Sequence, residues 1–251
     1  MNSLFISSLK RAFLSKWYIA SIIATVVMCY ICSYEYLTGA ENSVYIIDVM
    51  LHLGMFKKVM VFFSAIPFVT VFCQDYNSGY IKSLILRGGE RNYAWSNVIV
   101  CALSGFTAIF LGMLSYFCIL SFFCPVQPYE VPGVYNNIAS NSPVLFFMII
   151  SVVFSLYATM WTIIGLTLSS ILPDNYVALG SPLIFGYIFE ELTFSFPSFI
   201  NLYDLSHNVG LFKKSPLFNF LYTIGVFILI MAIAGYVFSY FVKRRSRNEM
   251  V

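Results

Sequence analysis

The chain has 251 residues, of which 60% are hydrophobic, 19% are aromatic and only 10% are charged. Soluble domains carry about 25% charged residues, so a chain of this size could not hide so much apolar surface in a water-soluble core. We therefore predict an all-α integral membrane protein with a single transmembrane domain over residues 1–251. The net charge of +3 is too small to indicate nucleic-acid binding.

Residues 3–16, within an N-terminal elbow segment 1–16, predict an amphipathic helix that lies in the plane of the membrane interface. Apolar side chains recur on one side at helical spacing, while serines and cations share the other side. A secretory signal is not expected, because the cations follow apolar residues and no small-residue cleavage pattern comes next. The apolar side consists of Phe5, Ile6, Leu9, Ala12 and Phe13.

Six apolar stretches occupy residues 17–242, and each is near or above the roughly 20 residues that a bilayer-spanning helix needs. We predict that all six are transmembrane helices and that the long third and fourth ones are tilted. The predicted spans are Trp17–Leu37, Phe56–Cys73, Tyr93–Cys124, Val144–Leu172, Tyr176–Phe194 and Leu217–Val242.

The distribution of cations predicts a cell-membrane protein with both termini in the cytoplasm. With the N-terminus inside, ten of the 14 lysines and arginines are cytoplasmic, in agreement with the positive-inside rule. The basic tail 243–251 anchors the C-terminus on the same side. The inner cations are Lys10, Arg11, Lys16, Lys82, Arg87, Arg91, Lys243, Arg244, Arg245 and Arg247, and the outer ones are Lys57, Lys58, Lys213 and Lys214.

The three outer segments differ in kind. Thr38–Met55 contains an apolar pattern that predicts a short surface helix. Pro125–Pro143 is rich in Pro, Asn and Gly and predicts an irregular loop. Phe189–Phe199 is aromatic but interrupted by two acids and a proline, which predicts a re-entrant or interfacial hairpin before the last span.

Catalytic and metal-binding motifs are missing from the sequence. There is no GxxxxGK[ST] loop for ATP, no HExxH and no GxSxG. The pair Cys29 and Cys32 has CxxC spacing but falls inside a predicted span, where small hydrophobic residues are the simpler interpretation. We expect no catalytic residue, no metal site and no cofactor bound by this chain.

Ionisable residues are nearly absent from the predicted spans. Glu35 falls near the outer end of the first span, and Glu190 and Glu191 fall near the outer end of the fifth. These three residues are candidates for a substrate pathway, although solvated charges at helix ends fit equally well. Carriers coupled to protons or sodium usually place ionisable groups near the bilayer midplane, so the energy source is expected to lie outside this chain.

The segment Gln74–Asn92 is a polar interruption between the second and third spans. It predicts a helix stop, a short amphipathic helix and a second stop at Arg87-Gly88-Gly89. Such a helix presses either against the lipid surface or against a soluble partner. The first stop is formed by Asp75, Asn77, Ser78 and Gly79, and the apolar face by Ile81, Leu84 and Ile85.

With these features the chain resembles the permease subunit of an ABC-2 type transporter over nearly its whole length. The shared features are the elbow helix, six spans, a cytoplasmic coupling helix and a re-entrant region before the sixth span. The coupling segment 74–92 carries the motif: an acid, a glycine, a short helix and an arginine-containing turn. Asp75, Gly79, Ile81-Lys82 and Arg91 occupy those places.

The resemblance implies that two such subunits pair, as a homodimer or with a related permease, and bind two ATPase subunits that hold ATP and Mg²⁺. The coupling helix would sit in a groove of each ATPase, with Ile81, Leu84 and Ile85 in the groove. The alternative is a helix on lipid headgroups, with Lys82, Arg87 and Arg91 on phosphates. The implied interface consists of Asp75, Asn77, Gly79, Ile81, Lys82, Leu84, Ile85, Arg87, Glu90 and Arg91.

The expected function is ATP-driven movement of an amphipathic peptide or lipid-like substrate, and the resemblance points to bacterial peptide export or bacteriocin and lantibiotic immunity. Seven acids against four lysines on the predicted outer side would attract cationic peptides. Two alternatives remain: a non-transporting immunity or receptor protein that sequesters a toxin peptide, and an intramembrane enzyme. The enzyme needs a catalytic dyad at depth. The seven acids are Glu35, Glu41, Asp48, Glu130, Glu190, Glu191 and Asp204.

Overall fold

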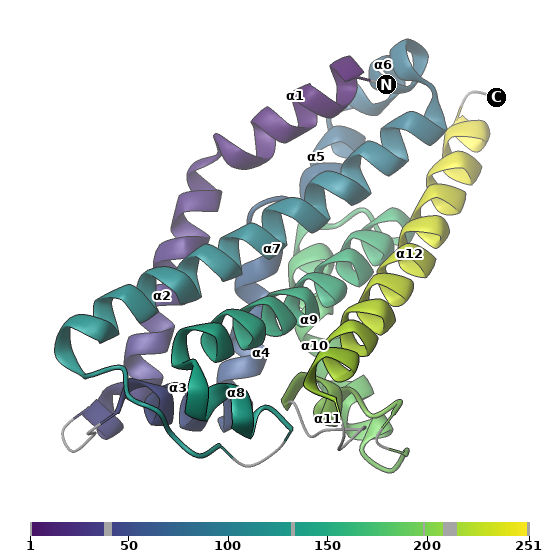
Figure 1. The fold of residues 1–251 in the computed structure, drawn as a ribbon. Helices are drawn as coiled ribbons and strands as arrows, with labels where there is room; N and C mark the ends of the chain where they lie inside the picture. The colour runs from purple at the N-terminus through teal and green to yellow at the C-terminus, as the bar shows by residue number, and fades with distance from the viewer. Residues whose placement is uncertain (1, 38–41, 132–133, 198, 208–214, 250–251) are drawn as a thin grey trace.

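The structure, a computed structural model, describes residues 2–37, 42–131, 134–197, 199–207 and 215–249. These residues form helices joined by turns and short irregular segments, with no strand among them (Figure 1). Glu41, Lys213 and Lys214, which the sequence assigns to the outer side, lie outside the described ranges. The predicted all-α fold class is confirmed.

Four helices are long and apolar enough to cross a membrane, which indicates a membrane-embedded protein. They match the first, third, fourth and sixth predicted spans to within a few residues, except that the last continues through most of the basic tail. The four are α2 (Lys16–Leu37), α7 (Glu90–Phe123), α9 (Pro143–Ile171) and α12 (Pro216–Glu249).

The second predicted span is broken into two short helices, α4 (Gly54–Ala65) and α5 (Val71–Asn77). The break at 66–70 contains Pro67, whose ring removes a backbone donor from the helical hydrogen-bond ladder. The fifth predicted span is α10 (Asn175–Thr193), which contains Pro182 and has two glutamates in its last turn. Neither stretch forms the long apolar helix that the other four do.

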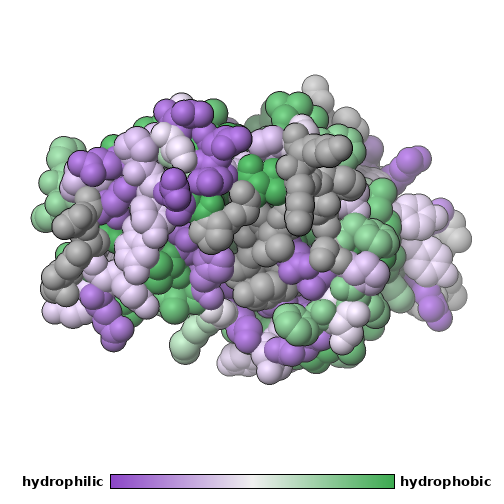
Figure 2. Space-filling model, turned by 60° about the horizontal axis from the view of Figure 1, so that its bottom comes forward, coloured by the Kyte–Doolittle hydropathy of each residue, from purple (hydrophilic) through white to green (hydrophobic). Residues whose placement is uncertain are grey.

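The helices run between two ends of the molecule (Figure 1). The first, here named the α6 end, holds α1 (Asn2–Phe13), α5, α6 (Tyr80–Gly88) and the last turns of α12. The second, named the α3 end, holds α3 (Ser43–His52), α8 (Asn136–Asn141) and α11 (Leu202–His207). Figure 2 brings the α3 end forward and shows hydrophilic residues scattered over it among apolar ones.

The core is centred on α9, which packs against α12, α7, α10 and α4. Aromatic rings fill the half toward the α3 end, where Phe117 and Phe147 stack with 4.2 Å between centroids. Close helix approach depends on glycine: a Cβ added at Gly112 would lie 2.5 Å from the side chain of Thr25 on α2. Small residues at helix contacts of this kind are typical of membrane bundles.

The first outer segment forms the predicted helix, while the second and third differ from prediction. The expected surface helix is α3, and its apolar residues Val44, Ile47 and Leu51 are buried against the bundle. The expected irregular loop contains α8. The expected hairpin is instead the end of α10 followed by turns, because a helix that starts at Asn175 continues through Glu190 and Glu191 to Thr193.

Candidate functional site

Two glycines set the limits of α6. Gly79 precedes it with φ +70°, and Gly89 follows it with φ +80°. Both values fall in the left-handed region, where a Cβ is unfavourable and glycine is the usual residue. The Gly79 N–H donates to the Tyr76 carbonyl at 3.0 Å, and the Gly89 N–H donates to the Ile85 carbonyl at 2.8 Å. A nine-residue helix therefore stands between two sharp changes of chain direction.

The apolar face of α6 points into this chain and not away from it. Ile81, Leu84 and Ile85 are buried in one cluster with side chains of α5, α7 and α12. The resemblance implies that these three residues enter a groove of another protein, whereas here they face this chain's own helices. The physical reason is that α5, α7 and α12 already remove them from solvent.

The opposite face of α6 is exposed and presents one large apolar side chain between two cations. Leu86 is 79% exposed, and Lys82 and Arg87 on either side of it are also exposed. Tyr80, at the start of the helix, is exposed as well. An apolar side chain this open at the end of a bundle is available to a partner.

Asp75 is the centre of a hydrogen-bonded group that joins three helices. Its carboxylate, 2% exposed as a residue, accepts from Arg11 Nη2 at 2.9 Å and Nη1 at 3.3 Å. Tyr93 Oη donates to Asp75 Oδ2 at 2.9 Å. Burial lowers the pKa of Arg11, but the hydrogen bond and charge of Asp75 outweigh it, so this pKa is raised. Asp75 thus fastens α5 to α1 and α7, and its carboxylate faces this chain instead of the outside.

The remaining predicted interface residues surround α6 without forming one patch. Asn77 is exposed at the end of α5, and Arg91 is exposed in the first turn of α7. Glu90 accepts a hydrogen bond from Ser246 Oγ at 2.8 Å, which attaches the end of α12 to α7. The outward residues available to a partner are therefore those of α6 together with Asn77 and Arg91.

Arg245 is a site residue that the sequence placed only in a basic tail. Its Nη2 donates to the carbonyl of Ile171 at 2.8 Å, and its guanidinium lies 4.7 Å from the Tyr76 ring. Ile171 is the last residue of α9, where backbone carbonyls lack helical partners and attract cations. The attraction of cations to a helix C-terminus explains the contact, but it could not have identified which arginine makes it.

Helix α1 packs along α7 and reaches α6. Ala12 is fully buried, and Ser8 Oγ donates to Asn97 Oδ1 at 3.4 Å. Leu4 lies where a side chain on Gly88 would have to go. The helix is therefore connected to both ends of the segment 74–92, through Arg11 and through Leu4.

A second charged group lies away from α6, between α4 and α10. Lys57 Nζ and Glu190 Oε1 are 2.6 Å apart, and the two side chains are only 2% and 13% exposed. Lys57 Nζ also lies 5.4 Å from the centroid of the Tyr157 ring. The two residues stand near the outer ends of the second and fifth predicted spans, and no sequence pattern indicated that they would be buried together. The partners are separated by 133 residues, so no local pattern could join them.

The three candidates for a substrate pathway do not come together. Glu190 is bonded to Lys57, while Glu191 is exposed on the same helix. Glu35 is exposed near the end of α2, which lies across the bundle from α10 (Figure 1). Within the described ranges no group of three or more His, Cys, Asp or Glu side chains could hold a metal ion.

Comparison with known proteins gives no relative: no family model matches the chain, and no curated protein or solved structure matches it either.

Proposed function

We propose that this protein is the permease subunit of an ATP-driven transporter of the ABC-2 type, and that a separate subunit hydrolyses ATP. The observation that carries the proposal is α6: a short helix between two left-handed glycines, buried on one face and open on the other, at one end of a helical bundle. A soluble partner could displace a helix of this kind, and the displacement would be transmitted to the bundle.

The proposal includes six membrane crossings, made by α2, α4 with α5, α7, α9, α10 and α12. Exposed cations gather at the α6 end, which supports a cytoplasmic position for that end under the positive-inside rule. Exposed acids at the α3 end, Glu130 and Glu191, agree with the opposite assignment. The exposed cations at the α6 end are Lys10, Arg11, Lys82, Arg87, Arg91, Lys243 and Arg244.

The contacts of α6 supply a route for coupling. Its buried face packs on α5, α7 and α12, and Asp75 ties α5 to α1 and α7. A displacement of α6 would therefore reach the long helix α7 in two ways. One is the direct contact of α6 with α7, and the other is the contact through α5 and Asp75. The partner would bind ATP and Mg²⁺ in two copies, beneath two permeases that expose apolar faces of α2 and α12 to lipid or to one another.

The substrate we propose is an amphipathic molecule, a peptide or a lipid-like compound, moved across or out of a bacterial membrane. An aromatic interior near the α3 end and a mildly acidic surface there would favour a cationic peptide. Bacteriocin export or immunity fits that chemistry.

The experiment that tests the proposal is co-purification of the tagged, membrane-extracted chain with a soluble ATPase at native expression. Leu86→Asp should weaken the association at least about tenfold, because an exposed apolar residue at the centre of an interface is the kind that carries binding energy. Leu172→Asp is the matched control: Leu172 is 59% exposed on the turn between α9 and α10.

Two results would contradict the proposal. If the wild-type chain binds no ATPase, the protein acts without one, as expected of an immunity protein that sequesters a toxin. If both variants keep the ATPase equally well, α6 is not the contact. Both variants must reach the membrane in wild-type amounts for the comparison to count.

A further inference from the structure

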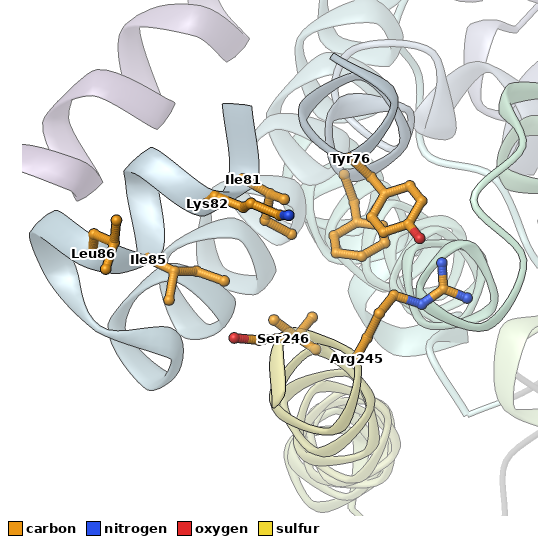
Figure 3. Close-up of a pocket in the computed structure, with 9 residues that line it drawn as sticks. Tyr76, Ile81, Lys82, Ile85, Leu86, Arg245 and Ser246 are labelled. Atoms are coloured by element: carbon orange, nitrogen blue, oxygen red, sulfur yellow. The ribbon is translucent and has the colours of Figure 1, made fainter. Parts of the chain in front are cut away.

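A cavity of about 100 Å³ lies between α5, α6 and the last turns of α12. Its walls are mostly apolar and include Phe72, Ile81, Ile85, Val242 and the exposed Leu86. Lys82 and Arg245 contribute cations to its edge. Figure 3 shows the opening along α12, with Ile81 and Ile85 on one side and Arg245 beside Tyr76 on the other.

The cavity lies at the inner ends of two predicted spans, where hydrocarbon would give way to headgroups. Phe72 and Val242 are the most buried of its lining residues and stand at the inner ends of the second and sixth predicted spans. Tyr76 and Arg245 are one helical turn further along α5 and α12. A molecule in the cavity would therefore have an apolar part at membrane depth and a polar part at the surface.

The cations at the edge are placed for an anionic group. Arg245 is held by Ile171 and Tyr76, and the bond to Ile171 uses one of the five N–H donors of a guanidinium. Lys82 is exposed and reaches from α6 across the opening (Figure 3). Basic pockets between membrane helices on the cytoplasmic side bind the headgroups of anionic lipids.

We propose that this cavity binds one anionic phospholipid, with part of an acyl chain beside Phe72 and Val242 and the phosphate between Lys82 and Arg245. The volume admits a section of one chain and not a whole lipid. The apolar walls continue into helices of the membrane region, which favours a lipid over a side chain of a soluble protein. The inference goes beyond the proposed transport function and needs no ATPase.

The test measures lipid binding to the purified full-length chain in detergent, with phosphatidylglycerol and phosphatidylcholine as probes, by native mass spectrometry. Lys82→Glu and Arg87→Glu form a matched pair, since both reverse one exposed cation of α6 and only Lys82 lines the cavity. Lys82→Glu should reduce phosphatidylglycerol affinity about tenfold or more, whereas Arg87→Glu should change it by less than about twofold. Wild-type protein should bind phosphatidylcholine more weakly.

A third variant tests the cavity itself. Ile85→Phe adds bulk to its wall and should lower the affinity for both lipids while the melting curve stays close to that of the wild type. Equal losses in Lys82→Glu and Arg87→Glu would mean general surface attraction and would overturn the proposal. Equal binding of the two lipids, or no binding of phosphatidylglycerol, would also overturn it. Either result would favour a side chain of another protein as the occupant of the cavity. The charge-reversal pair decides the matter even if Ile85→Phe does not fold.

Discussion

Asp75 shows how a single residue connects the segment 74–92 to the rest of the molecule. Its carboxylate is buried, and it accepts hydrogen bonds from Arg11 on α1 and Tyr93 on α7. A buried charge is tolerated when its hydrogen-bonding capacity is filled in this way. The residue therefore contributes to the position of α6 indirectly, by fixing the helix that precedes it.

Removing that charge should destabilise the protein more than removing one of its donors. Asp75→Asn leaves Arg11 without its ionic partner and should lower the free energy of unfolding by about 2 kcal/mol. Tyr93→Phe removes one hydrogen bond and should cost about 1 kcal/mol. Thermal unfolding in detergent measures both. An Asp75→Asn variant as stable as the wild type would show that the group does not hold the helices together.

The pair Lys57 and Glu190 should behave as a coupled unit. Replacing one partner leaves the other charge buried, so Lys57→Met or Glu190→Gln alone should cost about 3 kcal/mol. The double variant should cost clearly less than the sum of the two. Glu191→Gln is the control, because Glu191 is exposed on the same helix. Strictly additive effects in the unfolding curves would mean that the two side chains do not interact.

At this scale the sequence identifies candidate residues but not their partners. Asp75 stands out in the sequence as part of a helix stop, yet its partner Arg11 is 64 residues away. Lys57 and Glu190 both appear as charges at helix ends, and only the packing of α4 on α10 buries them together. Charge patterns are local, whereas ion pairs of this kind depend on tertiary structure.

The element α6 is where prediction from sequence succeeded in part. The glycines and the spacing of Ile81, Leu84 and Ile85 predicted a short amphipathic helix, and the structure contains one at Tyr80–Gly88. The pattern could not say what covers the apolar face. A period of 3.6 residues shows that one side is apolar but does not distinguish a partner's groove from the chain's own α5, α7 and α12.

The packing of α9 on α10 should depend on Gly165. A Cβ added there would lie 2.5 Å from Pro182 Cγ and 3.0 Å from the Ala178 carbonyl, which is backbone and cannot move aside easily. Gly165→Ala should therefore lower stability by about 1–3 kcal/mol in thermal unfolding.

Gly180→Ala is the matched control for that prediction. A Cβ at Gly180 meets nothing within 4 Å, so alanine should be neutral or stabilising by up to about 1 kcal/mol. If the two variants unfold at the same temperature, the close approach of α9 and α10 is not required for the fold.

For the whole molecule, composition and hydrophobic runs predicted an all-α fold and the positions of its long helices. The same runs did not predict that the second stretch is broken at 66–70 or that α10 carries Glu190 inward. Length and apolarity identify helices able to cross a membrane, but interruptions and buried charges are decided by what neighbouring helices satisfy. The count of six crossings and the ATPase partner remain predictions.

The central claim is that the outward face of α6 meets a soluble ATPase, and photocrosslinking in intact cells tests it most directly. A photoreactive amino acid in place of Leu86, which is 79% exposed at the mouth of the cavity, can reach a partner outside the bundle, whereas one in place of the buried Ile85 stays inside the cavity wall. The proposed function predicts a crosslink from position 86 to an ATP-binding protein and only intramolecular or lipid products from position 85. Crosslinks from position 86 to lipid alone, with no ATP-binding protein, would contradict it.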